Sequence, residues 1–184
     1  MMDLSRRGFA FGAVATTLAA CGNGIGSAGA ATIDARADST LNALYQTYPG
    51  TRQLASQAAG ILVMPLVTEV GLGLGGSYGR GALRVGDSTV DYYAAASGSA
   101  GLQIGAQQFS HVLFFMTQDA LQEFRASQGW AAGADVEYAF SNQAEMLRAE
   151  TTTSLSPVIA AVFGQTGLRV GATLEGTNYP RIIP

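Results

Sequence analysis

The pattern of apolar and polar residues divides the chain into a helical first part and a longer part with the periodicity of strands. Between Asp34 and Tyr48, apolar side chains recur at helical spacing, and Pro49-Gly50 ends the pattern. Thr51 is placed to cap a second, short helix that ends near Gly60. After Gly60 the apolar residues alternate with polar ones or form short runs, which indicates strands.

One helix interrupts the part with strand periodicity. Thr117 is placed to cap it, and Gly129 ends it. Pro65 ends the first predicted strand, and Gly86-Asp87 forms a turn. The predicted strands lie at 61–64, 71–85, 89–93, 98–106, 111–116, 134–140, 157–163 and 168–174. These elements predict an α+β fold of one domain: a mostly antiparallel, curved β-sheet with the N-terminal helices and one inserted helix packed on it.

A regular series of small residues marks the second predicted strand. Every second residue is Gly or Ser, at Gly71, Gly73, Gly75, Ser77, Gly79 and Gly81, and segment 97–107 has a similar small face. An extended chain would carry almost no side chains on that face, so something must approach its backbone closely. We expect either the domain's own helices or an acyl chain there, and a tightly curved sheet would explain the glycines without a ligand.

Two catalytic or cofactor motifs can be tested against this periodicity. Gly71, Gly73 and Gly76 satisfy G-x-G-x-x-G, but strand periodicity and further glycines follow where a dinucleotide site needs a helix. His111 is the only histidine, beside Ser110 and near Asp119, without the G-x-S-x-G turn of many hydrolases. We therefore expect a protein that is not an enzyme and holds no cofactor or metal; a hydrolase built on His111 is the alternative.

The first 21 residues resemble a signal for export. Arg6 and Arg7 precede an apolar stretch at 8–20 that is too short to span a membrane. The segment S-R-R-G-F resembles a twin-arginine signal, and L-A-A-C resembles a bacterial lipobox, in which the cysteine is acylated and becomes the mature N-terminus. Cys21 is the only cysteine, which excludes a disulfide within the chain.

This signal predicts the organisation and location of the protein. Residues 1–21 are the signal, 22–33 a flexible Gly/Ala tether, and 34–184 the folded domain. Gly22 follows Cys21 where an Asp would retain a lipoprotein in the inner membrane, so the resemblance implies the outer membrane of a Gram-negative host. We expect a lipid-anchored protein on the periplasmic or outer face of that membrane.

The charge excludes one class of partner. All 10 basic residues are Arg, and 13 acidic residues give a pI of about 5.0. A nucleic-acid binder would show a basic face and a high pI, so no nucleic-acid partner is expected.

Five residues form a candidate lipid-binding face on the glycine-rich strand. Alternation places them together, at Leu72, Leu74, Tyr78, Arg80 and Arg84. Apolar side chains that lead to two guanidiniums could hold an acyl chain and a phosphate in sequence. The alternative is that both arginines are solvated at the end of a hairpin.

Six segments of the chain resemble the SYLF domain, a lipid-binding module also named after yeast actin-associated proteins. They are G-L-G-L-G-G-S-Y-G-R-G-A-L at 71–83, G-L-Q-I-G-A-Q at 101–107, V-L-F-F-M-T at 112–117, G-W-A-A-G-A-D at 129–135, V-F-G-Q-T-G-L at 162–168 and L-E-G-T at 174–177. The resemblance implies binding of phospholipids, including phosphoinositides in eukaryotic members, without known catalysis.

Two departures from the family limit what it implies. The predicted N-terminal helices offer only Arg36 and Arg52 as basic residues, and Asn178 stands where Lys is common. We therefore expect no specific recognition of phosphoinositides, and no actin bundling in a bacterial envelope. The sequence predicts a lipoprotein anchored through Cys21 whose SYLF-like domain binds phospholipid. The alternative is a structural or partner-binding outer-membrane lipoprotein without a lipid ligand.

Overall fold

The computed structural model describes residues 24–132, 136–139, 156–164, 167–168, 174 and 176–184. The signal residues Arg6, Arg7 and Cys21 lie outside this part. The described elements are three helices, α1 (Ala28–Thr47), α2 (Thr51–Gln57) and α3 (Gln118–Ala126), and eight strands. The strands are β1 (Gly60–Val85), β2 (Ser88–Phe115), β3 (Trp130–Ala131), β4 (Val136–Ala139), β5 (Val158–Gly164), β6 (Gly167–Leu168), β7 (Asn178–Tyr179) and β8 (Arg181–Ile182).

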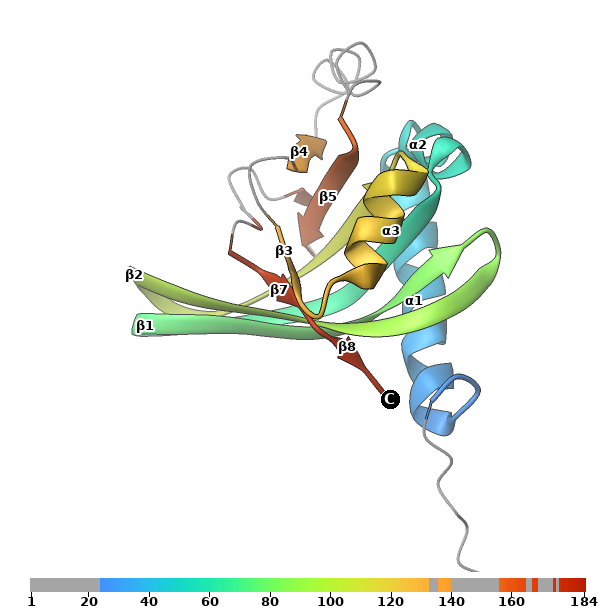
Figure 1. Cartoon of the computed structure of the whole chain (residues 1–184). Coiled ribbons are helices and arrows are strands. Elements are labelled where there is room, and N and C mark those ends of the chain that lie inside the picture. Colours follow the sequence, from blue (N-terminus) through green and yellow to red (C-terminus); the bar gives the residue numbers. More distant parts are fainter. Residues whose placement is uncertain (1–23, 133–135, 140–155, 165–166, 169–173, 175) are drawn as a thin grey trace, which may run out of the picture.

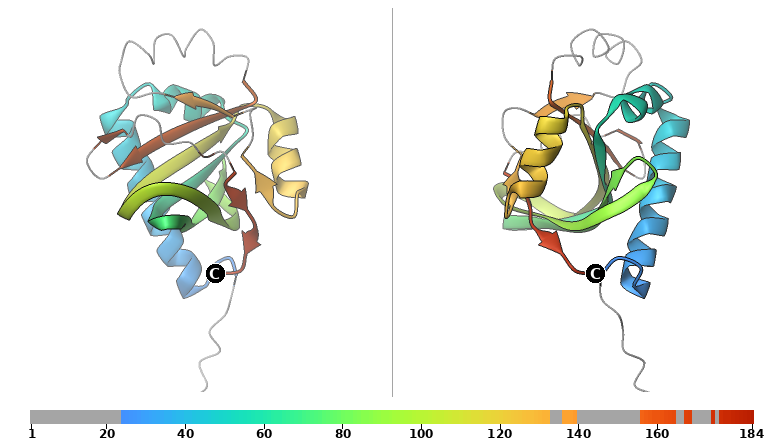
Figure 2. Two further views of the ribbon diagram at one scale, coloured as in Figure 1. Left: turned by 90° about the vertical axis from the view of Figure 1, so that its left-hand side faces the viewer. Right: turned by 45° about the vertical axis from the view of Figure 1, so that its right-hand side comes forward.

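The predicted α+β fold with one curved, mostly antiparallel sheet is confirmed (Figure 1). Only β4 and β5 pair in parallel among the described strands. Figure 2 shows α1 and α3 on opposite sides of the sheet. The predicted hairpin near the end is present as β5 and β6, and the short strands β3, β7 and β8 were not predicted.

Helix α1 begins six residues before its predicted start. The Ser27 side chain accepts a hydrogen bond from Ala30 N at 3.0 Å and caps the helix at Ala28. The expected tether over 22–33 is therefore wrong from residue 28 onward. Ala30 and Ile33 are buried against the sheet. This packing stabilises the first helical turns of α1, which the Gly/Ala-rich composition predicts to be flexible.

Strands β1 and β2 form one hairpin, where several separate strands were predicted. Gly86, with φ of +58°, makes the expected turn between Val85 and Ser88. The prediction that Pro65 ends a strand is wrong, because the register shifts between Met64 and Val67 and accommodates Pro65 in a β-bulge.

The hairpin folds back on itself. A Cβ at Gly79 would lie 2.7 Å from Leu66 O, and one at Gly81 would collide with Val63 O. These contacts pair residues on either side of position 72, where a second register shift separates Leu72 from Gly73. The small face at Gly79 and Gly81 therefore lies against the backbone of the same strand, which admits no side chain there.

Two apolar clusters cover the two faces of the folded sheet. One includes Leu113, Phe115 and Tyr179 and contains Leu121 and Phe124 of α3, whose predicted cap Thr117 is confirmed. The other contains Val63, Ala82, Tyr92, Val112 and Phe114 of the sheet with Ala30, Ile33, Ala37 and Leu44 of α1. Strand β5 lies beside β2, with His111 opposite Val162, so the predicted central position of 111–116 is confirmed.

Candidate functional site

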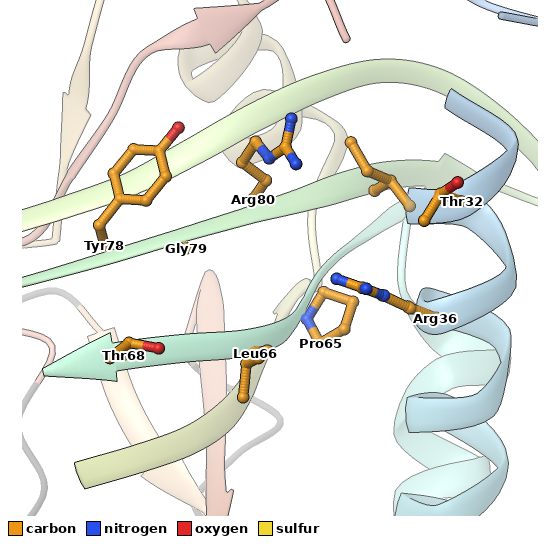
Figure 3. A pocket seen from close by; sticks show the side chains of 9 residues that line it. Thr32, Arg36, Pro65, Leu66, Thr68, Tyr78, Gly79 and Arg80 are labelled. Carbon is orange, nitrogen blue, oxygen red and sulfur yellow. The ribbon is translucent and has the colours of Figure 1, made fainter. Parts of the chain in front are cut away.

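A pocket of about 190 Å³ lies where α1 meets the two halves of the folded β1 strand. Its lining comes from three short segments: Thr32, Ile33 and Arg36 of α1; Pro65, Leu66 and Thr68 of the first half of β1; and Tyr78, Gly79 and Arg80 of the second half. Figure 3 shows Arg36 reaching from the helix towards Pro65, with Tyr78 and Arg80 on the facing strand segment. We name this the α1–β1 pocket.

Local packing positions each wall of the α1–β1 pocket. Ile33 and Ala37 are buried and hold α1 on the sheet, while Thr32 and Arg36, one turn apart, remain exposed. The bulge at Pro65 turns Leu66 outward, so that its side chain is 37% exposed. Ser110 Oγ donates to Pro65 O at 2.6 Å and fixes this bulge.

The pocket combines two positive charges with an apolar wall. Arg36 and Arg80 are both exposed, and within the described part of the chain neither guanidinium has a hydrogen bond or an ion pair. No acidic residue is among the described residues that line the pocket. Tyr78, 56% exposed, lies beside them with Pro65 and Leu66. Such a site favours an anionic group attached to an apolar body.

The predicted site residue Arg84 lies outside the α1–β1 pocket. Its Nη2 donates to Asp38 Oδ1 at 2.6 Å and lies 3.8 Å from Asp34 Oδ1. Only 15% of its side chain is exposed. Arg84 therefore joins β1 to α1 through ion pairs, and its charge is compensated.

Asp34 connects Arg84 to two further residues. Thr89 Oγ1 and Tyr92 Oη each donate to the Asp34 carboxylate at 2.8 Å. Burial, together with the hydrogen bond and the negative charge of Asp34, raises the pKa of Tyr92 to about 12, so its hydroxyl remains a donor. We name Asp34, Asp38, Arg84, Thr89 and Tyr92 the Arg84 clamp.

Of the five predicted lipid-binding residues, the structure brings Tyr78 and Arg80 together. Leu72 pairs with Ile104 and Leu74 with Ala100 across the hairpin. The side chains of Leu72 and Leu74 are not among those that the structure describes. The prediction missed Thr32, Ile33, Pro65, Leu66 and Thr68, and did not assign Arg36 to the site. One signal was available, since Arg36 is the only basic residue between 28 and 47.

His111 is a buried core residue. Its Nε2 lies 3.0 Å from Tyr179 Oη, and Nδ1 has no hydrogen-bond partner among the described residues. Burial lowers the pKa of His111 to about 3, so the ring is neutral at ordinary pH. Its neighbour Ser110 donates to Pro65 O and points to the other face of the strand. These two residues therefore do not form a nucleophile and base.

The described residues contain neither a helix that could span a membrane nor a metal-binding group of side chains. No helix there combines the length and apolar character needed to cross a bilayer. No group of three or more His, Cys, Asp or Glu side chains there could hold a metal ion.

Comparison with known families finds one match. Residues 96–180 match the Ysc84 family, described as Las17-binding protein actin regulator. No curated protein matches the chain. The matched segment runs from β2 through α3 to β7, so the residues that line the α1–β1 pocket precede it.

Proposed function

Because this chain carries a SYLF domain, the domain of the lipid-binding or actin-associated Ysc84 family, we propose that it binds a phospholipid in the α1–β1 pocket. The phosphate lies between Arg36 and Arg80, and the apolar part of the lipid contacts Pro65, Leu66 and Tyr78. The protein is a non-enzymatic envelope lipoprotein, held in the outer membrane by acylated Cys21.

Two arginines without an acidic residue in the lining of the same pocket support this proposal most directly. Arg36 and Arg80 come from different elements, 44 positions apart in the sequence, and line one pocket. An anion bound in the pocket is attracted by both positive charges. A guanidinium also presents a planar set of donors that matches phosphate oxygens.

The anchor changes what the pocket must do. Acyl chains on Cys21 contribute about 0.8 kcal/mol for each buried CH₂ group and hold the protein at the membrane on their own. The pocket therefore need not provide membrane affinity, and its contacts can select among lipids. Actin, the partner named in the family's description, is not proposed as a partner for an exported chain.

Titration of the unacylated Cys21→Ser protein with vesicles tests this function. We expect binding to phosphatidylglycerol vesicles, with Arg36→Ala and Arg80→Ala each weakening it about tenfold, because each removes one charge-assisted contact. Arg52→Ala is the matched control: it removes an exposed arginine that lies over the Tyr45 ring, outside the pocket. The double pocket variant carries both Arg36→Ala and Arg80→Ala. Equal affinities of this variant and of the Arg52→Ala control for phosphatidylglycerol vesicles would reject the proposal.

The second candidate is a structural or partner-binding lipoprotein without a lipid ligand. One observation favours it: Gly79 and Gly81 close against the strand's own backbone, so this part of the small-residue face needs no ligand to explain it. Native mass spectrometry of the purified protein separates the candidates. A lipid retained by the parent protein and lost from the double pocket variant supports the first, and a protein that neither retains nor takes up lipid supports the second.

A further inference from the structure

The two ends of the described domain meet at the start of α1. Gly24 N and Ser27 Oγ both donate to Pro184 O, each at 3.2 Å. A Cβ on Gly29 would lie 3.0 Å from Pro184 C, so the last residues also pack on the first turn of the helix. Figure 1 shows the C-terminal end beside the start of α1. We name residues 24–29 and 182–184 the terminal junction.

The sheet holds the terminal junction in place. In β8, Ile182 pairs with Tyr92 and Arg181 with Tyr93 of β2. Arg181 Nε also lies 3.4 Å from Asp91 Oδ1. The terminal junction is therefore part of the folded domain, and fixing its position at a membrane would also fix the position of the sheet.

The side chains of the terminal junction are mostly apolar and carry no charge. Among the large hydrophobic residues described as exposed, Ile183 at 77% and Ile25 at 66% are the most exposed. Residues 24–33 and 182–184 contain no charged side chain. The first charged residue of α1, Asp34, is engaged by Thr89 and Tyr92. Burial of this surface in an apolar environment would thus desolvate no charged side chain.

We infer that the terminal junction docks on the bilayer that holds the acyl chains of Cys21, an inference that rests on the proposed acylation. Cys21 precedes Gly24 by three residues, which span about 11 Å at most. The polar layer of one leaflet is about 5–8 Å thick. An anchored chain therefore holds Ile25 and Ile183 at the membrane surface, where these side chains enter the interface and fix the orientation of the domain.

This orientation also brings the α1–β1 pocket towards the lipid. Arg36 follows Ala28 by eight residues, about 12 Å along the helix axis. Side chains on a helix lean towards its N-terminus, which here is the membrane side. The Arg36 end of the α1–β1 pocket therefore lies near the headgroups when the junction is docked.

Fluorescent labels in the acylated mature protein, residues 21–184, test the docking. Acylation occupies Cys21, the only cysteine, so Ile25→Cys and Ile183→Cys provide unique thiols for an environment-sensitive dye. Gln46→Cys, exposed near the other end of α1, is the control. In phosphatidylcholine vesicles, we expect quenching by nitroxide-labelled lipid at positions 25 and 183 to be several-fold stronger than at 46. Equal quenching at all three positions would overturn the inference.

Two further measurements separate this inference from the proposed lipid site. Arg36→Ala combined with Arg80→Ala should leave the quenching at position 25 unchanged. The vesicles have no net charge, and neither arginine belongs to the terminal junction. A loss of quenching in this variant would assign the contact to the pocket and overturn docking through the junction. Absence of acyl chains from the mature protein by mass spectrometry would also overturn docking, while pocket titrations with the Cys21→Ser protein would stand.

Discussion

The Arg84 clamp and the α1–β1 pocket are two contacts between the same helix and the same strand, and they use arginine in opposite ways. Arg84 lies against two aspartates of α1 and holds the helix to the sheet. Arg80, four residues earlier on the same strand, lines a pocket with Arg36 and has no acidic residue among the described lining of that pocket. The comparison shows that the helix residues opposite each arginine decide whether its charge stabilises the fold or remains for a ligand. The predictions below test that division.

The largest effect should come from removing the fold-back on which both contacts depend. Gly81→Ala places a methyl group against Val63 O, a backbone atom that cannot move without bending the strand. We expect a loss of about 3 kcal/mol or more in the free energy of unfolding, together with loss of lipid binding. Chemical denaturation measures the first and vesicle titration the second.

Gly98→Ala is the control for that substitution. It lies on the partner strand of the same hairpin, and a Cβ there meets no atom within 4 Å. We expect little change in stability, or a small gain from reduced freedom of the unfolded chain. Equal destabilisation by both substitutions would show that the close contact with Val63 O is not the cause of the loss at Gly81.

Acid should separate stability from lipid binding. The pKa of His111 is about 3 in the folded protein and about 6.5 when solvated, so the unfolded chain binds the extra proton between these values. The contribution of neutral His111 to the free energy of unfolding is fully present above pH 6.5. It falls by up to about 1.4 kcal/mol per pH unit towards pH 3. At pH 5 the expected loss is about 2 kcal/mol, measured by denaturation.

The matching variant isolates His111 from the carboxylates that also titrate in acid. His111→Phe keeps a buried ring and removes the titrating group, so its stability should fall less between pH 7 and pH 5. Parallel curves for the two proteins would assign the acid sensitivity elsewhere. His111 lies outside the lining of the α1–β1 pocket, so the folded protein's affinity for phosphatidylglycerol should change little between pH 7 and pH 5.

Breaking the Arg84 clamp should reduce stability and leave the pocket able to bind. Asp34→Ala removes the acceptor for Thr89 and Tyr92 and one of the two carboxylates near Arg84. We expect a loss of about 1–2 kcal/mol in the free energy of unfolding, with lipid affinity no weaker than in the parent protein. Asp87→Ala, exposed in the hairpin turn, is the control. Weaker lipid binding by Asp34→Ala alone would contradict the division between clamp and pocket.

The smallest effect should come from Arg80→Lys. The substitution retains the positive charge of the pocket and removes the planar set of donors. We expect affinity for phosphatidylglycerol to fall by about two- to threefold, less than for Arg80→Ala. A loss as large as that of Arg80→Ala would show that donor geometry, rather than charge, dominates the contact.

Alternation along the strand correctly predicted which of these side chains share a face of β1. Tyr78, Arg80 and Arg84 all lie on the face of β1 that meets α1, as their spacing indicated. What the spacing could not provide is the position of α1 over that face. Whether Arg36 or an aspartate stands opposite each strand residue depends on long-range packing of Ile33 and Ala37, which a local pattern does not contain.

Two local signals gave incorrect predictions. Pro65 predicts the end of a strand, because proline lacks the N–H that a strand ladder needs. A bulge accommodates it, and that bulge places Leu66 in the pocket wall. The small residues of 22–33 predicted a flexible tether, although Ser27 supplies an N-cap and Ile33 a buried contact. In both cases tertiary contacts, absent from the local pattern, decided the outcome.

The fold-back also has a consequence for the order in which the chain folds. Val85 and Ser88 pair across a turn of two residues, whereas Gly60 and Phe115 pair across most of the hairpin. The entropy cost of closing a loop grows with its length, so we expect pairing to begin at Gly86-Asp87 and to proceed outward. The contact of Gly81 with Val63 requires both halves of β1 to have paired. The pocket therefore forms late, and a partly folded chain has a hairpin before it has a site for lipid.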